Sequence, residues 1–499
     1  MSLRRNVVAN FSGQLYTTLI GILLVPLYVQ YMGVEAYGLV GFYAMLQGWF
    51  MLLDMGLTPT LGREAARFNG GALDALGLRR LVRSLEGIFV AVALSGALLL
   101  IAGAGLIADR WLKVEHLGLA EVQRALMLMA VIIGLRWLCG LYRGAISGFE
   151  HIVWLSGFNA AVATLRFVVV VPYLIYVGAT PTHFFVYQLV VTVIETGLLV
   201  GKTYRLLPPV EVAGWIRWDW RPLLGVMRFA LSAAFTSAVW VLVTQTDKLL
   251  LSGLIPLSDF ALFTLAVLVA SGVSVLSSPI AGAILPRLTR LSAEGDDAGV
   301  VRLYRDATQL VAVITIPVVL VLAFFPLPVL TAWTNQPALA TKAAPVLTLY
   351  AIGNGVLAMA AFPYYLQVAR GNLNMHLIGN LIFVLLFMPI LWLAVANFGM
   401  VGAGYAWISA NALPFLLWLP FVHHRFLKGM HWRWLTRDIG VVALVPTVSA
   451  AMAAHFIKWP AARWALLAAL SAVYLMLALL AAGSSSTLRN RLRCAMGTT

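Results

Sequence analysis

Charged side chains that interrupt long apolar stretches are the first candidates for chemistry in this sequence. Arg136, Arg166 and Glu195 each lie well inside a run of hydrophobic residues. A charged side chain in the middle of a membrane helix costs about 2.5–3.5 kcal/mol on insertion scales, so such residues usually face a cavity or an opposite charge. A guanidinium group also forms forked, charge-assisted hydrogen bonds to phosphate or pyrophosphate.

Two interpretations of these charges stay open. In the first, Arg166 and Glu195 form an ion pair that only fastens neighbouring helices. In the second, Arg136 and Arg166 form a basic patch in a hydrated cavity, and Glu195 releases Arg166 when an anionic ligand arrives. Both can hold at once, because the ion pair would be the resting state of the binding site.

Further polar side chains fall within apolar stretches and extend the list of candidates. Gln14 and Gln47 add hydrogen-bonding amides, which serve either as contacts between helices or as contacts to a sugar. Asp247 and Lys248 are adjacent, hence about 100° apart on a helix, so we expect one to face the interior while the other pairs or reaches the membrane surface. The predicted substrate-binding residues are Arg136, Arg166, Glu195, Gln14, Gln47, Asp247 and Lys248.

Three acids are candidates for carrying a coupling proton: Asp54, Glu195 and Asp247. For Asp54 and Asp247 the alternative is a place at the membrane boundary, where an acid is solvated and carries no proton.

Catalytic motifs are missing from the sequence. It contains no Gly-x-x-x-x-Gly-Lys-Ser/Thr loop, no His-Glu-x-x-His and no Cys-x-x-Cys. His423 and His424 beside Arg425 predict a solvated turn at a helix end rather than a metal site, and Cys139 and Cys494 are interpreted as free thiols. We therefore predict a protein that is not an enzyme and has no catalytic residue, cofactor or metal.

Composition fixes the class of protein that must position these residues. Hydrophobic residues make up 62% of the 499 and charged residues only 11%, with a mean hydropathy of +0.92. These values are typical of an all-α, polytopic membrane protein. The excess of 34 Lys and Arg over 19 Asp and Glu is explained by orientation in the membrane, so no nucleic-acid partner is predicted.

The apolar runs predict about fourteen transmembrane helices, because roughly twenty residues at ~1.5 Å each cross a ~30 Å hydrocarbon core. The predicted spans are 7–31, 37–58, 85–107, 122–141, 153–177, 184–204, 229–251, 260–285, 310–325, 346–367, 377–396, 401–422, 439–456 and 464–480.

An internal repeat predicts two lobes. The hairpin around residues 6–67, with a turn at 32–36 and Pro59 followed by arginines, returns near residue 226 with a turn at 253–259 and Pro286. Such parallel repeats suggest two half-bundles about a central axis. The predicted domains are a six-helix lobe at 1–206, a cytoplasmic linker at 207–225, a second six-helix lobe at 226–424, and an extra helix pair with a tail at 425–499.

Loop charges predict the orientation of the chain. Most Lys and Arg fall on alternate ends of the helices, among them Arg63, Arg143, Arg205, Arg287 and Arg425. By the positive-inside tendency these ends are cytoplasmic, which places both termini inside the cell.

Several motifs resemble one family of transporters. They are Asn10-Phe11-Ser12-Gly13, Pro26-Leu27-Tyr28, Gly33-Val34-Glu35-Ala36-Tyr37-Gly38, Asp54-Met55-Gly56-Leu57 and Asp247-Lys248-Leu249-Leu250. Together they resemble the polysaccharide transporter (Wzx-type oligosaccharide or O-antigen flippase) family of the multidrug/oligosaccharidyl-lipid/polysaccharide exporter superfamily. The resemblance covers essentially the whole chain.

The resemblance implies a function and partners. It implies that a polyprenyl-pyrophosphate-linked oligosaccharide is flipped across the bacterial inner membrane by alternating access, for lipopolysaccharide and related cell-surface polysaccharides. The implied partners are that lipid-linked oligosaccharide, membrane lipids, and polymerase or assembly proteins of the same pathway. Two alternatives stay open: an ion-coupled multidrug or metabolite antiporter, and a membrane-embedded polysaccharide polymerase or glycosyltransferase.

Overall fold

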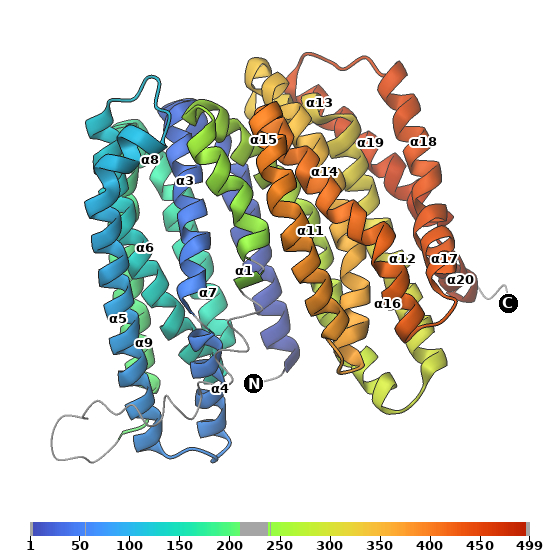
Figure 1. Ribbon diagram of the computed structural model, residues 1–499, viewed down its shortest axis with the longest axis horizontal. Helices are drawn as coiled ribbons and strands as arrows, with labels where there is room; N and C mark the ends of the chain where they lie inside the picture. The colour runs from blue at the N-terminus through green and yellow to red at the C-terminus, as the bar shows by residue number, and fades with distance from the viewer. Residues whose placement is uncertain (1–2, 55, 210–237, 240, 496–499) are drawn as a thin grey trace. The chain divides into compact units, whose positions relative to one another are not determined.

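The protein is a bundle of long apolar helices. The computed structural model describes residues 3–54, 56–209, 238–239 and 241–495 (Figure 1). Within that part of the chain, twelve helices are long and apolar enough to cross a membrane, and the only extended pairing is an isolated bridge between Lys113 and Pro256. The predicted class, an all-α multi-pass membrane protein, is confirmed.

The number of spans differs from the predicted one for two reasons. The candidate span Asn374–Phe426 joins two helices that meet at the non-helical residue Gly399, and these two helices correspond to the predicted spans 377–396 and 401–422. The chain bends between them at Gly399, whose φ of 56° and ψ of −136° suit a residue without a Cβ atom. The predicted span 229–251 begins among residues that the structure does not describe.

The chain divides into two compact units, Met1–Ala261 and Leu262–Thr499. We call them unit 1 and unit 2. Residues 241–254 are helical and belong to unit 1. The predicted division into two six-helix lobes and an extra helix pair stays a prediction, and most of the predicted linker 207–225 lies outside the described residues.

Helix boundaries in unit 1 follow recognisable local signals. Gly33, at φ 89°, separates α2 from α3, as the turn at 32–36 predicted. Asp74 caps α5 by accepting a hydrogen bond from the Gly77 N–H, and Pro181 opens α9. The elements are α1 (Leu3–Leu23), α2 (Val25–Met32), α3 (Val34–Phe50), η1 (Met51–Asp54), α4 (Leu57–Asn69), α5 (Ala75–Leu106), η2 (Ile107–Trp111), α6 (Leu119–Gly148), α7 (Ile152–Ala163), η3 (Thr164–Val169), α8 (Val170–Tyr176) and α9 (Pro181–Leu206).

Helix α6 is the centre of unit 1, because it packs against α3, α4, α5 and α9. Glycines allow α6 to approach α4 closely. A Cβ atom on Gly148 would collide with the Gly62 carbonyl oxygen, and one on Gly144 would lie 2.6 Å from the Thr58 carbonyl oxygen. This small-x-x-x-small spacing is the usual way for membrane helices to approach closely.

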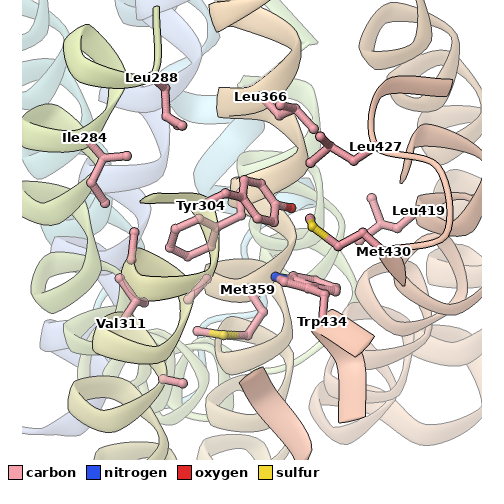
Figure 2. Packing of buried hydrophobic residues seen from close by; sticks show 14 of the residues in the cluster. Ile284, Leu288, Tyr304, Val311, Met359, Leu366, Leu419, Leu427, Met430 and Trp434 are labelled. Atoms are coloured by element: carbon pink, nitrogen blue, oxygen red, sulfur yellow. The ribbon is translucent and has the colours of Figure 1, made fainter. Parts of the chain in front are cut away.

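Unit 2 is built around a buried cluster that includes Tyr304, Met359, Leu366 and Trp434 (Figure 2). Trp434 is fully buried, and its indole N–H donates to the Thr308 hydroxyl at 3.0 Å. The elements are α11 (Leu257–Ala293), whose first residues fall in unit 1, α12 (Asp297–Phe324), α13 (Pro326–Thr334), α14 (Pro337–Ala369), α15 (Asn374–Leu417), α16 (Leu419–Phe426), α17 (His431–Arg433), η4 (Trp434–Gly440), α18 (Val441–Phe456), α19 (Arg463–Ser484) and α20 (Ser486–Ala495).

Candidate functional site

Three arginines and one glutamate meet inside unit 1, and we call them the basic cluster: Arg136, Arg143, Arg166 and Glu195. Arg136 and Arg143 come from α6, Arg166 from η3 and Glu195 from α9. Glu195 lies eleven residues before the end of α9 at Leu206, about 16 Å along the helix. The cluster is therefore within the membrane-spanning part of the unit.

Arg166 and Glu195 are the buried centre of the cluster. The Arg166 guanidinium donates to the Glu195 carboxylate at 2.5 Å, to the Thr192 hydroxyl at 2.9 Å and to the Gln188 side-chain oxygen at 3.2 Å. Arg166 is 4% exposed and Glu195 is 0% exposed. The ion pair between Arg166 and Glu195, the first of the two interpretations of these charges, is therefore present.

The backbone that carries Arg166 is unusual and well fixed. Residues Thr164–Val169 form a π-helical turn, which widens the helix and leaves carbonyl groups in need of partners. Three side chains supply them: Tyr187 donates to the Leu165 carbonyl at 2.8 Å, Gln188 to that of Arg166 at 3.0 Å, and Tyr28 to that of Phe167 at 2.7 Å. These hydrogen bonds thus fix the backbone from which the Arg166 side chain extends.

Arg143 is the member of the cluster that sequence reasoning missed. The loop-charge pattern places Arg143 among the cytoplasmic charges. In the structure its guanidinium pairs with the second carboxylate oxygen of Glu195, and its side chain is 31% exposed. The signal was in the sequence, because Arg136 and Arg143 are seven residues apart and so lie on one face of α6, two turns from each other.

Arg136 is bound more loosely than its neighbours. It is half-buried and donates to the Gln47 side-chain oxygen of α3 at 2.9 Å. It also lies close enough to Arg166, and to Glu195 and the Tyr43 hydroxyl, to interact with them electrostatically. Arg136 and Gln47, which the sequence predicts separately as binding residues, are thus brought to the same place as the predicted pair Arg166 and Glu195.

Charge in the basic cluster is not balanced. Among the ion pairs that the described residues form, Arg143 and Arg166 share the one carboxylate of Glu195, and Arg136 adds a third positive charge nearby. The Nε–H groups of Arg143 and Arg166 and the side-chain nitrogen of Gln47 are buried without a hydrogen-bond partner among the described residues. A buried donor without an acceptor is costly, so the cluster is chemically suited to an anion with several acceptor oxygens.

The other predicted residues lie elsewhere or serve other roles. Gln14 is exposed on α1. Asp247 is 1% exposed and pairs with Lys248 at 3.3 Å, so the two neighbours bind each other, which is one of the two outcomes expected for them. Asp54 accepts hydrogen bonds from the N–H and hydroxyl of Thr58 at the start of α4, as an acid at a helix boundary does.

Unit 2 corrects the interpretation of His423. It was expected in a solvated turn, but its ring is 0% exposed and lies 2.8 Å from the Tyr304 hydroxyl and 2.9 Å from the His431 ring. His424, the next residue, is exposed. The helix α16 turns one histidine into the core and the other outward, which their adjacency in a helix requires.

A polar network in unit 2 contrasts with the basic cluster. We call it the Asp438 network: Arg305, Gln309, Asp438 and Ser485. Arg305 binds Asp438 through two hydrogen bonds, at 2.8 and 3.0 Å. Gln309 donates to Asp438 at 2.7 Å and accepts from the Ser485 hydroxyl at 2.8 Å.

Comparisons with known proteins agree on the family and the fold. The sequence profile of the family described as "Polysaccharide biosynthesis protein" matches residues 3–292, more than half of the chain. A protein of Shigella flexneri named "Putative O-antigen transporter" is 20% identical over 84% of this chain and 98% of its own.

Among solved structures, the lipid II flippase MurJ in an inward closed conformation is similar, with a TM-score of 0.74 and 14% identity over 97% of this chain and 99% of its own. An inward-facing multidrug resistance MATE family transporter of the MOP superfamily is also similar, with a TM-score of 0.65 and 13% identity over 84% of this chain and 98% of its own. These two likenesses concern the fold. The profile match confirms the resemblance noted in the sequence, and the chain belongs to the polysaccharide biosynthesis protein family.

Proposed function

We propose that this protein moves a polyprenyl-pyrophosphate-linked oligosaccharide from the cytoplasmic to the periplasmic face of the bacterial inner membrane by alternating access. The observation that carries the proposal is the charge surplus of the basic cluster, three arginines against one glutamate. The name of the Shigella flexneri relative and the fold shared with a lipid II flippase support the same class of cargo.

The proposed cargo suits the cluster because a pyrophosphate presents several charged acceptor oxygens. Arg136 is the proposed first contact, since it is half-buried and held by one neutral partner. Pyrophosphate would then compete with Glu195 for Arg143 and Arg166, whose Nε–H groups have no partner. In this proposal the ion pairs of Glu195 hold the arginines in place until the cargo arrives.

Other predicted residues have proposed roles that follow from their positions. Gln14 and Gln47 are proposed contacts to sugar or phosphate, and Asp247 with Lys248 is proposed to bind cargo at a second place in unit 1. Glu195 is the proposed coupling acid, because protonation would release two arginines at once. Asp54 is a weaker candidate, since its carboxylate is held by Thr58.

Orientation and organisation complete the proposal. Both termini are proposed to lie in the cytoplasm, which the distribution of Lys and Arg along the sequence supports. Two six-helix lobes, 1–206 and 226–424, would supply the moving halves, and polymerase or assembly proteins of the same pathway are the proposed partners.

The proposal is tested with the full-length protein in proteoliposomes that contain a fluorescent polyprenyl-pyrophosphate oligosaccharide. Translocation is measured as the label that becomes accessible to a membrane-impermeant quencher. We expect transport by the wild type, and a loss of about tenfold or more in Arg136→Gln, because one charge-assisted contact to phosphate is removed. Arg124→Gln is the control: Arg124 lies on the same helix in an exposed pair with Glu121, and its variant should transport normally.

The same liposomes separate the alternatives. Uptake of a cationic dye with no movement of the lipid-linked sugar would replace the proposal with a multidrug antiporter, whose fold this chain shares. Longer glycan chains formed from the labelled lipid would instead identify a polymerase. Equal transport by the wild type and Arg136→Gln would remove the basic cluster from the mechanism.

A further inference from the structure

A second site lies in unit 2, away from the basic cluster. A cavity of about 590 Å³ opens where α11 ends and α12 begins, and α20 forms part of its wall. We call it the amphipathic pocket. Its charged and polar lining residues are Arg287, Asp296, Arg302, Asp306 and Thr487.

One side of the amphipathic pocket is apolar. Ile284 belongs to the buried core of unit 2, and Ile280, Leu291 and Leu303 pack against that core (Figure 2 shows Ile284 beside Leu288). Leu488 of α20 adds to the lining. Such a surface favours methylene groups over water, so a small inorganic ion would leave most of this lining without a partner.

The two arginines of the pocket are available to bind a ligand. Arg287 and Arg302 are both exposed, and neither has an ion pair or side-chain hydrogen bond with another described residue. Arg290, one turn along α11, differs because it pairs with Glu294 at 3.4 Å. Two unpaired guanidinium groups at one cavity are suited to a phosphate group.

Each of the two acids of the pocket uses one carboxylate oxygen in a hydrogen bond. One oxygen of Asp296 accepts from the Gly299 N–H at 2.8 Å, and one oxygen of Asp306 accepts from the Thr487 hydroxyl at 2.8 Å. Each carboxylate keeps a second oxygen that accepts no hydrogen bond within the described part of the chain. These oxygens are suited to an ammonium group, which has three donors and no acceptor.

The wall that α20 contributes is built into the fold. The Thr487 N–H donates to the Gln309 side-chain oxygen at 3.0 Å, and Gln309 is itself fixed by Asp438. The pocket lies toward the end of α11, where its arginines Arg287 and Arg290 lie, and at the start of the span Asp297–Phe324, hence near the level of lipid headgroups.

We propose that the amphipathic pocket binds a zwitterionic aminophospholipid, with its phosphate on Arg287 and Arg302 and its ammonium on Asp296 and Asp306. The glycerol and the first methylenes of the acyl chains pack on the apolar side. The pocket carries two cations and two anions, so a headgroup with both charges matches it better than a purely anionic one. The site is independent of the basic cluster and of the cargo proposed above.

The test is native mass spectrometry of the full-length protein in mild detergent, titrated with phosphatidylethanolamine. We expect the first bound lipid to dissociate about tenfold more readily from the Arg287→Gln/Arg302→Gln variant than from the wild type, because the phosphate contacts are lost. The matched control is Arg290→Gln/Arg425→Gln, which removes two exposed arginines of unit 2 outside the pocket and should bind as the wild type. Because Arg287 and Arg302 form no ion pair or side-chain hydrogen bond with another described residue, their replacement should leave the fold intact.

Three further ligands decide the chemistry. Phosphatidylglycerol lacks the ammonium group and phosphatidylcholine cannot donate hydrogen bonds from it, so both should bind several-fold more weakly to the wild type than phosphatidylethanolamine. Equal or tighter binding of phosphatidylglycerol would overturn the role of the acids. Binding of inorganic phosphate as tight as that of the lipid, or unchanged lipid binding in Arg287→Gln/Arg302→Gln, would overturn the lipid site.

Discussion

The basic cluster of unit 1 and the Asp438 network of unit 2 are two solutions to the same problem. Each places a fully buried carboxylate, Glu195 or Asp438, against arginine within a membrane-spanning helix. In the Asp438 network one arginine meets one aspartate, and Gln309 uses both ends of its amide. In the basic cluster three arginines meet one glutamate, and two of them keep an Nε–H without a partner.

The difference distinguishes a network that holds helices together from one that can bind a ligand. A balanced and fully hydrogen-bonded network holds helices together and has no donor left for a ligand. An unbalanced one is less favourable for the fold, because uncompensated buried charge costs several kcal/mol per ion. The surplus charge of the basic cluster therefore favours a role in binding an anion, which the following predictions test.

The largest expected effect follows the change Glu195→Gln. It removes the carboxylate that Arg143 and Arg166 share, and we expect the free energy of unfolding to fall by about 3–5 kcal/mol. Added inorganic pyrophosphate should restore part of that loss, because it replaces the missing negative charge. Thermal unfolding of the detergent-solubilised variant, with and without pyrophosphate, measures both effects, and an absence of rescue would count against an accessible anion site.

The matching change in unit 2 is Asp438→Asn. Arg305 and Gln309 lose a charged acceptor, and we expect a loss of about 2–3 kcal/mol, at the low end for a buried pair because Arg305 is 35% exposed. Pyrophosphate should give less rescue than in Glu195→Gln, because this change frees one arginine, Arg305, instead of two. Asp297→Asn is the control, because Asp297 is 72% exposed in its pair with Arg370 and should lose less than about 1 kcal/mol.

A third change tests how α6 carries the basic cluster. In Gly148→Ala the new methyl group meets the Gly62 carbonyl oxygen and the Ala65 side chain, and we expect a loss of about 1–3 kcal/mol from overpacking. In Gly201→Ala no atom lies within 4 Å of the new Cβ, so the higher helix propensity of alanine should raise stability by up to about 1 kcal/mol. Equal effects of the two changes would show that the contact between α4 and α6 is not close.

Much of this contrast could be predicted from the sequence, for physical reasons. Arg136, Arg166 and Glu195 stand out because charge within apolar stretches is rare, and helix lengths place Arg166 and Glu195 at similar depth. The order of the helices follows from the apolar runs, and the predicted break between 396 and 401 coincides with the non-helical residue Gly399. The backbone angles of that glycine are not encoded in hydropathy.

What the sequence did not predict depends on which way a side chain points. Arg143 and His423 are near helix ends, where solvation is the usual outcome, but helix packing turns them inward to Glu195 and Tyr304. The π-helical turn at Thr164–Val169 has no signature in residue type, since it is stabilised by donors from distant helices. Periodicity detects a helix face but not the partner that covers it.

The smallest expected effect on stability belongs to Arg136→Gln, and it separates the two interpretations of the basic cluster most sharply. Arg136 contributes positive charge to a cluster that already has a surplus, and its guanidinium donates a hydrogen bond to the neutral side chain of Gln47. If the cluster only fastened helices, loss of Arg136 would weaken it. If the cluster binds an anion, the free energy of unfolding should change by less than about 1 kcal/mol or rise, because one uncompensated charge is removed, while the affinity for inorganic pyrophosphate falls about tenfold.

Thermal unfolding and isothermal titration of the same sample measure the two quantities, with Arg124→Gln as the control on the same helix. A clear loss of stability with unchanged pyrophosphate affinity would place the basic cluster beside the Asp438 network, as a second fastening of helices.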